Sequence, residues 1–272
     1  MQIRVEVLGP LAVTLDGVGT VPTAAKPRKV LALLAVRAGQ VVPVPVLIKE
    51  LWGEHPPASA LTTLQTYILQ LRRLLADALK ARGIRDPGAK RVLRTAYGGY
   101  QLDADPAASD VCEFRTLAAV GSRALELGDP DTAGRVLRSA LRVWRGPALQ
   151  DVEPGPELDT EVRHLEESRM MARYRRIDAD LATGRHNELL GELAALSSQQ
   201  WMDERVCEQY MLALYRSGRR LDALAAYQRI RAELRREMAL EPRPRLRRLQ
   251  QAILAAAPEL EVRARHPQLL LG

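Results

Sequence analysis

The first third of the chain mixes two kinds of hydrophobic pattern. Apolar residues alternate with polar ones over residues 3–7 and again over 11–15, which predicts two half-buried strands with a turn at Asp16-Gly17. Helix patterns follow over residues 27–39, which begin with proline and end at glycine, and over about 44–52.

A longer helix pattern covers residues 59–75 and has two very different faces. Its apolar stripe recurs at steps of three and four: Leu61, Leu64, Ile68, Leu71 and Leu75. The opposite face carries hydroxyls, amides and guanidiniums: Thr62, Thr63, Gln65, Thr66, Gln70, Arg72 and Arg73. A solvated helix face normally mixes acids with bases, yet no acid occurs between Glu54 and Asp77.

The stretch "KRVLRTAYGGYQLDAD" contains two β-prone runs around Gly98-Gly99, which predicts a hairpin. The order of strands, three helices and a hairpin is typical of an α+β winged helix-turn-helix, in which the third helix takes the recognition position. Lys90, Arg91 and Arg94 are expected where such a wing meets a nucleic-acid backbone.

The rest of the chain is predicted to be almost entirely helical. One helix face gathers Ala133, Val136, Leu137, Ala140, Leu141 and Trp144, and a long helix is expected over residues 161–183. Segments beginning at Gly184 and Gly218 resemble each other at an offset of 34 residues, with Leu190, Leu193 and Leu196 matching Leu224, Tyr227 and Ile230. That offset is the period of a tetratricopeptide repeat, so an all-α repeat domain is expected.

Charge is distributed unevenly along the 272 residues. Residues 1–103 hold 14 basic and 7 acidic residues, so they carry the whole net charge of +7, and no lysine follows Lys90. This imbalance predicts a polyanionic partner for the first third and a different partner for the rest. The arginine pairs of the later part, such as Arg175-Arg176, have acids nearby and are expected on solvated faces.

Helix position, charge and side-chain chemistry together favour DNA as the partner of the 59–75 helix. Guanidinium and hydroxyl groups bind phosphates, whereas Gln, Arg and Thr can read base edges in the major groove. An ordinary solvated face that happens to lack acids is the plain alternative. A helical-repeat adaptor, whose basic first domain docks onto an acidic protein, is the alternative from another class.

Several motifs resemble the Streptomyces antibiotic regulatory proteins. "VLGPLAV", "LWGEHPPASALTTLQTYILQLRRLL" and "YGGYQL" are similar to the winged helix of that family, whose fold is that of OmpR/PhoB output domains. "LRVWRGPAL" and "LALYRSGRRLDALAAYQRIRAELRREMALEP" are similar to its bacterial transcriptional activation domain. The resemblance covers residues 2–258 and implies a winged helix over 1–103, an activation domain over 106–258 and a tail over 259–272.

The resemblance also implies a function and partners. It implies a short-form activator of antibiotic or other secondary-metabolite genes that binds direct repeats in double-stranded DNA and recruits RNA polymerase, including its sigma factor. Carried over from the OmpR/PhoB pattern, the groove-facing set is Thr62, Thr66, Tyr67, Gln70 and Arg72, whereas Thr63 and Arg73 match phosphate contacts. Arg94 and Thr95 match wing contacts to the backbone or the minor groove, and Gln70 stands where a basic residue is common.

Other kinds of site are not supported by the sequence. No nucleophile–base arrangement or cofactor loop is visible, the four histidines form no metal-ligand spacing, and Glu153, Glu157 and Asp159 lack a catalytic partner. Cys112 and Cys207 are expected to be inert core thiols, which suits the cytoplasm, and Trp52 and Trp144 to be core anchors. We therefore expect a cytoplasmic, nucleoid-associated protein with no catalytic residues, cofactor, metal or membrane span.

The expected assembly follows from the lack of a heptad zipper. Together with the direct repeats that the resemblance implies, it predicts a monomer in solution and a head-to-tail pair on DNA. The sequence identifies neither the target genes nor the half-site, the polymerase subunits contacted or any effector.

Overall fold

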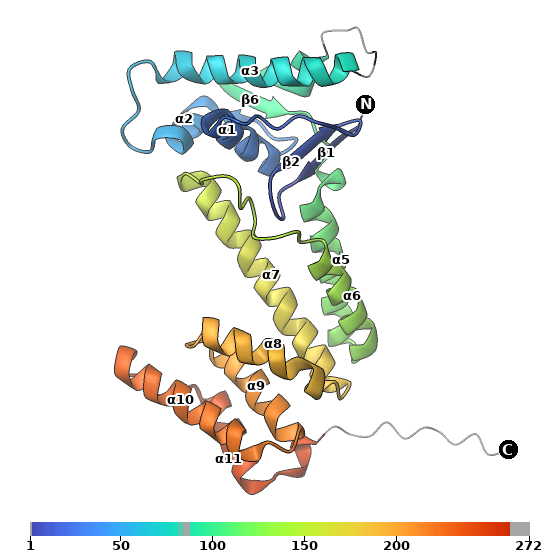
Figure 1. Cartoon of the computed structure of the whole chain (residues 1–272), viewed down its shortest axis with the longest axis vertical. Coiled ribbons are helices and arrows are strands. Elements are labelled where there is room, and N and C mark those ends of the chain that lie inside the picture. The colour runs from blue at the N-terminus through green and yellow to red at the C-terminus, as the bar shows by residue number, and fades with distance from the viewer. Residues whose placement is uncertain (1, 82, 84–87, 262–272) are drawn as a thin grey trace, which may run out of the picture. The chain divides into compact units, whose positions relative to one another are not determined.

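The structure, a computed structural model, describes residues 2–81, 83 and 88–261 (Figure 1). The chain forms two compact units. The first contains Met1–Ala119 and Arg138–Ala172, and the second contains Val120–Leu137 and Arg173–Gly272. Most of the tail expected over 259–272 lies outside the described residues.

The first unit begins with a small antiparallel sheet in the order β1-β2-β3. β1 (Ile3–Glu6) pairs with β2 (Ala12–Leu15), and a turn at Asp16-Gly17 leads into β3 (Val18–Gly19). Both turn residues have positive φ, 48° and 86°, which suits the tight connection between β2 and β3. The two predicted strands are confirmed, whereas β3 has only two residues and leaves no alternation to detect.

A helix-turn-helix and a wing follow in the predicted order. The elements are α1 (Ala25–Val36), β4 (Val42–Pro43), α2 (Val44–Trp52), α3 (Ala60–Ala81), α4 (Ala89–Val92), β5 (Leu93–Ala96) and β6 (Gly99–Leu102). β5 and β6 form the expected hairpin, and β4 joins it in a second sheet of order β4-β6-β5. Figure 1 shows α3 along one side of the first unit, with α1, α2 and β6 beneath it.

Three further helices each have residues in both units. They are α5 (Asp110–Glu126), which follows a 3₁₀ turn at Pro106–Ala108, α6 (Pro130–Arg142) and α7 (Pro156–Ala182). Within the first unit, Trp144 packs edge-on against Phe114 with ring centroids 5.4 Å apart, and the guanidinium of Arg169 lies 4.5 Å from the centre of its ring. Trp144 is 7% exposed, so its expected role as a core anchor is confirmed.

In the rest of the second unit, successive helices pack against each other in pairs. These helices are α8 (His186–Gln199), α9 (Glu204–Arg216), α10 (Arg220–Met238) and α11 (Pro244–Ala255), and a 3₁₀ turn follows at Pro258–Leu260. The pairing of α8 with α9 and of α9 with α10 confirms the predicted tetratricopeptide-like architecture. Residues paired by the 34-residue offset have the same burial: Leu193, Leu196, Tyr227 and Ile230 are all buried, whereas Leu190 and Leu224 are partly buried.

One expectation about this part of the chain was wrong. Arg176 was expected on a solvated face, but it is 8% exposed. It lies between Asp180, one turn further along α7, and Glu192 of α8, and it forms ion pairs with both. A buried guanidinium is tolerated here because two carboxylates compensate its charge.

Candidate nucleic-acid interface

The buried side of α3 holds the helix against the rest of the winged helix. Its buried residues are Ala60, Leu64, Ile68, Leu71, Leu75, Ala78 and Leu79. The predicted stripe is confirmed from Leu64 to Leu75, but its first member is wrong, since Leu61 is 49% exposed. Ala60, four residues before Leu64, continues the stripe instead of Leu61, which lies three residues before it.

The opposite side of α3 presents the predicted polar side chains to solvent. Thr62, Gln65, Thr66, Gln70 and Arg73 are exposed, and Thr63 and Tyr67 are partly buried at the edges of this face. The hydroxyl of Thr66 donates to the carbonyl oxygen of Thr62, one turn earlier, at 3.0 Å. The face extends over four turns without a carboxylate before Asp77, which is the property expected of a surface that approaches phosphates.

Two leucines on this face were missed by the sequence analysis. Leu61 and Leu69 are each 49% exposed and lie among the exposed threonines and glutamines. Helical periodicity assigns Leu61 to the apolar stripe, and an isolated Leu69 carries no sequence signal for binding. An exposed leucine on a groove-facing helix is chemically suited to contact the methyl group of thymine.

Arg72 has contacts that differ from the base contact expected for it. Its guanidinium donates from Nε and Nη2 to the carbonyl oxygen of Leu93, at 3.0 and 2.9 Å, and from Nη2 to Oγ1 of Thr95 at 2.8 Å. Leu93 and Thr95 belong to β5 of the wing. Arg72 therefore fastens α3 to the wing, and Thr95 is its partner in this contact.

The wing supplies a second group of candidate residues. Arg94 on β5 is half exposed, and its Nη2 lies 3.1 Å from Oε1 of Gln101 and 4.0 Å from Asp103. Lys90 and Arg91 are exposed, but they lie on the one-turn helix α4 before the hairpin and not on the hairpin itself. Tyr97 at the tip of the hairpin is fully exposed and was not among the predicted residues.

Part of the basic excess of residues 1–103 is used inside the protein. Arg37 pairs with Glu157 at 2.9 Å and Glu161 at 3.3 Å, and Arg28 pairs with Asp151 at 3.2 Å. Arg28 lies on α1 and Arg37 is its C-cap residue, and their acidic partners lie on α7 or just before it. These two arginines are therefore not available to a polyanion, whereas Arg73, Lys90 and Arg94 remain exposed on α3, α4 and the wing.

Two buried carboxylates, also missed by the sequence analysis, connect the winged helix to the helical segments of the same unit. Glu50 of α2 is 2% exposed and accepts hydrogen bonds from the backbone amides of Gly155, Glu157 and Leu158 at 2.6, 2.9 and 3.1 Å. These amides open α7, so the carboxylate caps that helix and complements its dipole. A Cβ atom at Gly155 would lie 2.1 Å from the carbonyl oxygen of Glu50, so this approach requires glycine.

Asp110, the first residue of α5, is the second buried carboxylate, and it binds backbone amides that follow β1. It is 3% exposed and accepts from the amides of Val7 and Leu8 at 2.8 Å each, and Arg145 lies 3.4 Å away. Burial raises the pKa of its carboxyl group, and the two amides and Arg145 act in the opposite direction. The winged helix and the adjoining helices thus share hydrogen bonds whose loss would leave buried charges unpaired.

Over the described part of the chain, no three His, Cys, Asp or Glu side chains are grouped so that they could hold a metal ion. None of the helices described there is long and apolar enough to cross a bilayer. Cys207 is buried, as expected, whereas Cys112 is partly exposed.

The helix-turn-helix, the wing fastened to α3 and the carboxylate-free face define a winged-helix transcription regulator. Residues 19–101 match the family model described as transcriptional regulatory protein, C terminal, and residues 109–254 match that of the bacterial transcriptional activator domain. The chain belongs to the Streptomyces antibiotic regulatory protein family of transcriptional activators. Its relatives are regulatory proteins, and it is not an enzyme.

Individual relatives match almost the whole chain. Regulatory protein DnrI of Streptomyces peucetius is 50% identical over 259 residues, which cover 95% of this chain and 94% of DnrI. Regulatory protein AfsR of Streptomyces coelicolor is 39% identical over 95% of this chain and 25% of AfsR. The solved structure of Mycobacterium tuberculosis EmbR in complex with a low-affinity phosphopeptide is similar with a TM-score of 0.83 at 35% identity, over 94% of this chain and 66% of that one.

Proposed function

We propose that this protein activates secondary-metabolite genes, such as those for an antibiotic, by binding direct repeats near their promoters and recruiting RNA polymerase through its helical region. The observation that carries the proposal is the exposed face of α3, which has no carboxylate over four turns and is fastened through Arg72 to a basic wing. The protein's relatives DnrI and RedD are named as a regulatory protein and a transcriptional regulator, which supports a role in transcription regulation.

Within this proposal the contacts to DNA divide into two kinds. The bases of the major groove are contacted by one face of α3, which carries Thr62, Thr66, Tyr67, Gln70 and the exposed Leu61 and Leu69. The phosphates are bound by a second set of side chains: Thr63, Arg73, Lys90, Arg91 and Arg94. Such contacts position the protein on DNA without recognising the base sequence. Arg72 and Thr95 orient the wing relative to α3, so they affect both kinds of contact.

The helical region over 106–258 is proposed to contact the polymerase, including its sigma factor. Its charge is balanced, since all of the net positive charge lies in residues 1–103. Helix pairs of the tetratricopeptide type present extended surfaces to protein partners. We propose that the protein works in the cytoplasm, at the nucleoid.

Footprinting on neighbouring promoters, followed by transcription in vitro, tests this proposal with the full chain. We expect protection of two repeats in the same orientation, an affinity that falls steeply with salt through counterion release, and more transcript from the protected promoter. A DNA affinity that does not change with salt concentration would contradict the proposal. Binding without any increase in transcript would contradict it as well. The adaptor alternative predicts an acidic protein partner and no preference for one duplex.

A further inference from the structure

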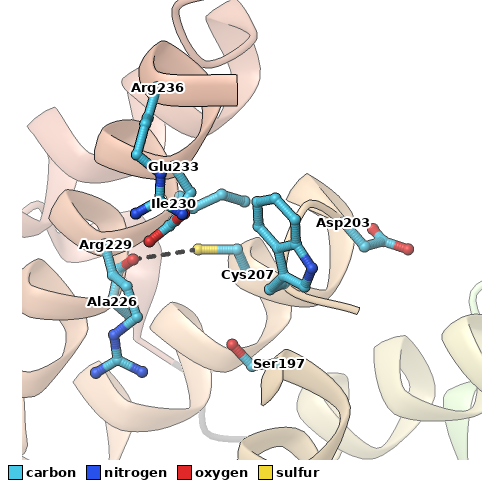
Figure 2. A pocket seen from close by; sticks show the side chains of 9 residues that line it. Ser197, Asp203, Cys207, Ala226, Arg229, Ile230, Glu233 and Arg236 are labelled. Carbon is cyan, nitrogen blue, oxygen red and sulfur yellow. Dashed lines mark hydrogen bonds and ion pairs between the residues drawn. The ribbon is translucent and has the colours of Figure 1, made fainter. Parts of the chain in front are cut away.

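A cavity of about 240 Å³ lies in the second unit, beside α10 (Figure 2). Ala226, Arg229, Ile230, Glu233 and Arg236 line it from α10. Ser197 at the end of α8, Trp201 and Asp203 in the turn that follows, and Cys207 of α9 complete the lining. Nothing in the DNA-binding function uses this cavity.

One wall of the cavity is formed by the partly exposed indole of Trp201. This indole is 41% exposed, whereas Trp144 is 7% exposed and anchors the core of the first unit. Trp201 also borders a second hollow, of about 360 Å³, with Tyr174 and Met202. An indole that borders two hollows has free ring surface against which a planar apolar group can stack.

The base of the cavity is apolar and chemically inert. Cys207 is 4% exposed, and its thiol donates to the carbonyl oxygen of Ala226 at 3.8 Å, as the dashed line in Figure 2 shows. Burial raises the pKa of this thiol to about 12, so it stays neutral and does not act as a nucleophile. Ile230 and Ala226 beside it are buried as well. The base of the cavity therefore offers apolar contact surface and no nucleophile.

The two acidic side chains of the lining already have partners. Asp203 accepts from the amides of Arg205 and Val206, where it caps α9, and from the hydroxyl of Tyr174. Glu233 forms an ion pair with Arg236. Their charges are therefore compensated by the protein.

Arg229 is the cation of the lining that the protein leaves free. Within the described residues, no hydrogen bond or ion pair engages its guanidinium, and its side chain is exposed. With the other charges compensated, the cavity presents one uncommitted positive group beside apolar and aromatic walls. A guanidinium binds a carboxylate or another planar anion through paired hydrogen bonds.

We propose that this cavity binds a small planar aromatic anion, such as an aromatic carboxylate of one or two rings, with the ring against Trp201 and the anionic group on Arg229. The volume suits a ligand of that size, and the lining combines apolar and aromatic surface with charged groups that can orient a ligand. The site goes beyond the proposed activation function, because it gives the second unit a small-molecule ligand in addition to its protein partner.

The probe for the test is 2-naphthoate, with 2-naphthamide as its neutral counterpart. The chain has three tryptophans, so ¹⁵N-labelled full-length protein gives three indole N–H signals, and Trp201→Phe assigns the one of interest. We expect 2-naphthoate to shift the Trp201 signal saturably and to leave the other two in place. The amide should bind at least about tenfold more weakly, because it lacks the charge-assisted bond to Arg229.

Two pairs of variants make the test specific. Ser197→Leu fills the cavity and should abolish the shift, whereas Ser198→Leu changes an exposed neighbour outside the lining and should retain it. Arg229→Gln should weaken binding at least about tenfold, whereas Arg248→Gln, an equal loss of charge on α11, should not. Thermal unfolding verifies that each variant is folded.

Absence of a saturable shift, equal affinity for acid and amide, or binding that survives both Ser197→Leu and Arg229→Gln would overturn the proposal. The experiment contains no DNA and no polymerase. Its failure is therefore distinguishable from a failure of the proposed activation function.

Discussion

The guanidinium of Arg72 donates two hydrogen bonds to the carbonyl oxygen of Leu93, at 3.0 and 2.9 Å, and so joins the candidate recognition helix to the wing. Leu93 is fully buried, and hydrogen bonds to a charged group contribute about 1.5–3 kcal/mol. Arg72 thus contributes to the relative orientation of α3 and the wing.

We expect Arg72→Lys to lower the free energy of unfolding by about 1–3 kcal/mol, because an ammonium group cannot reproduce the paired donors of a guanidinium. The variant should bind its specific duplex and a scrambled one more weakly by the same factor, since it misplaces the wing for both. Thermal unfolding and competition gel shifts measure the two effects. Arg73→Ala, at an exposed position, is the control that should weaken binding without changing stability. A loss for Arg72→Lys confined to the specific duplex would restore the base contact first expected for Arg72.

Gln70→Ala should alter sequence preference more than affinity for DNA in general. Gln70 is exposed on α3, and its amide both donates and accepts, as the edge of adenine requires. The expected loss of discrimination is about 1–3 kcal/mol at one base position, with little change on scrambled DNA. Selection of preferred sites from a randomised duplex measures it. An unchanged site preference would remove Gln70 from the base-reading set.

Glu50→Ala should destabilise the first unit far more than a typical surface substitution. The change removes the acceptor for the amides of Gly155, Glu157 and Leu158, of which Leu158 is buried and the other two are partly buried. The expected loss is about 2–3 kcal/mol. Glu54→Ala, at an exposed position just after α2, should cost less than about 0.5 kcal/mol. Denaturant unfolding of both variants gives the comparison, and equal losses would show that the cap contributes little.

The lowered pKa of His186 predicts that the stability of the protein depends on pH. Burial, and the positive charge of Arg216 after it, lower the pKa of this histidine from its ordinary value of 6.5. A lowered pKa in the fold means that the unfolded chain takes up the proton first. The contribution of His186 is therefore present above about pH 6.5 and is lost as the pH falls through the lowered value.

We expect the free energy of unfolding to fall between pH 8 and pH 5 by more in the wild type than in His186→Asn, which has no titrating group at this position. Chemical denaturation at several pH values measures the difference. His55→Asn, which replaces an exposed histidine, should follow the wild type. Parallel curves for the wild type and His186→Asn would contradict the expectation.

The spacing of DNA repeats should control occupancy by two copies. We expect head-to-tail neighbours, which join different surfaces of the two copies, and a protein that is monomeric in solution, because DNA can hold the two copies at high effective concentration. Moving one repeat by about 5 base pairs, half a helical turn, puts the copies on opposite faces of the duplex and should abolish cooperative binding. Sedimentation of the free protein and gel shifts on respaced and inverted repeats measure this. A tight dimer that prefers inverted repeats would contradict it.

The sequence by itself determined the elements and their order. Alternation over a few residues predicted β1 and β2, the periodic stripe predicted α3 from Leu64 to Leu75, and the 34-residue offset predicted the equivalence of α8 and α10. Strand and helix patterns depend on residues close together in the sequence, and the repeat is found by comparing the chain with itself. Neither requires knowledge of tertiary contacts. The chemistry of the exposed α3 face was equally visible, because side-chain type does not depend on folding.

Tertiary structure alone decided which side chains were committed to the protein itself. Arg72 was expected to contact DNA, and only the fold shows that β5 supplies it with a carbonyl acceptor; no sequence pattern singled out Glu50, whose partners lie 105 to 108 residues away. Glu157 seemed to have no partner in the sequence, yet it pairs with Arg37. Periodicity tells which face of a helix is buried but not what covers it. Glu50 and Asp110 are compensated largely by backbone amides, which nearly every residue carries, so no pattern of side chains could have indicated them.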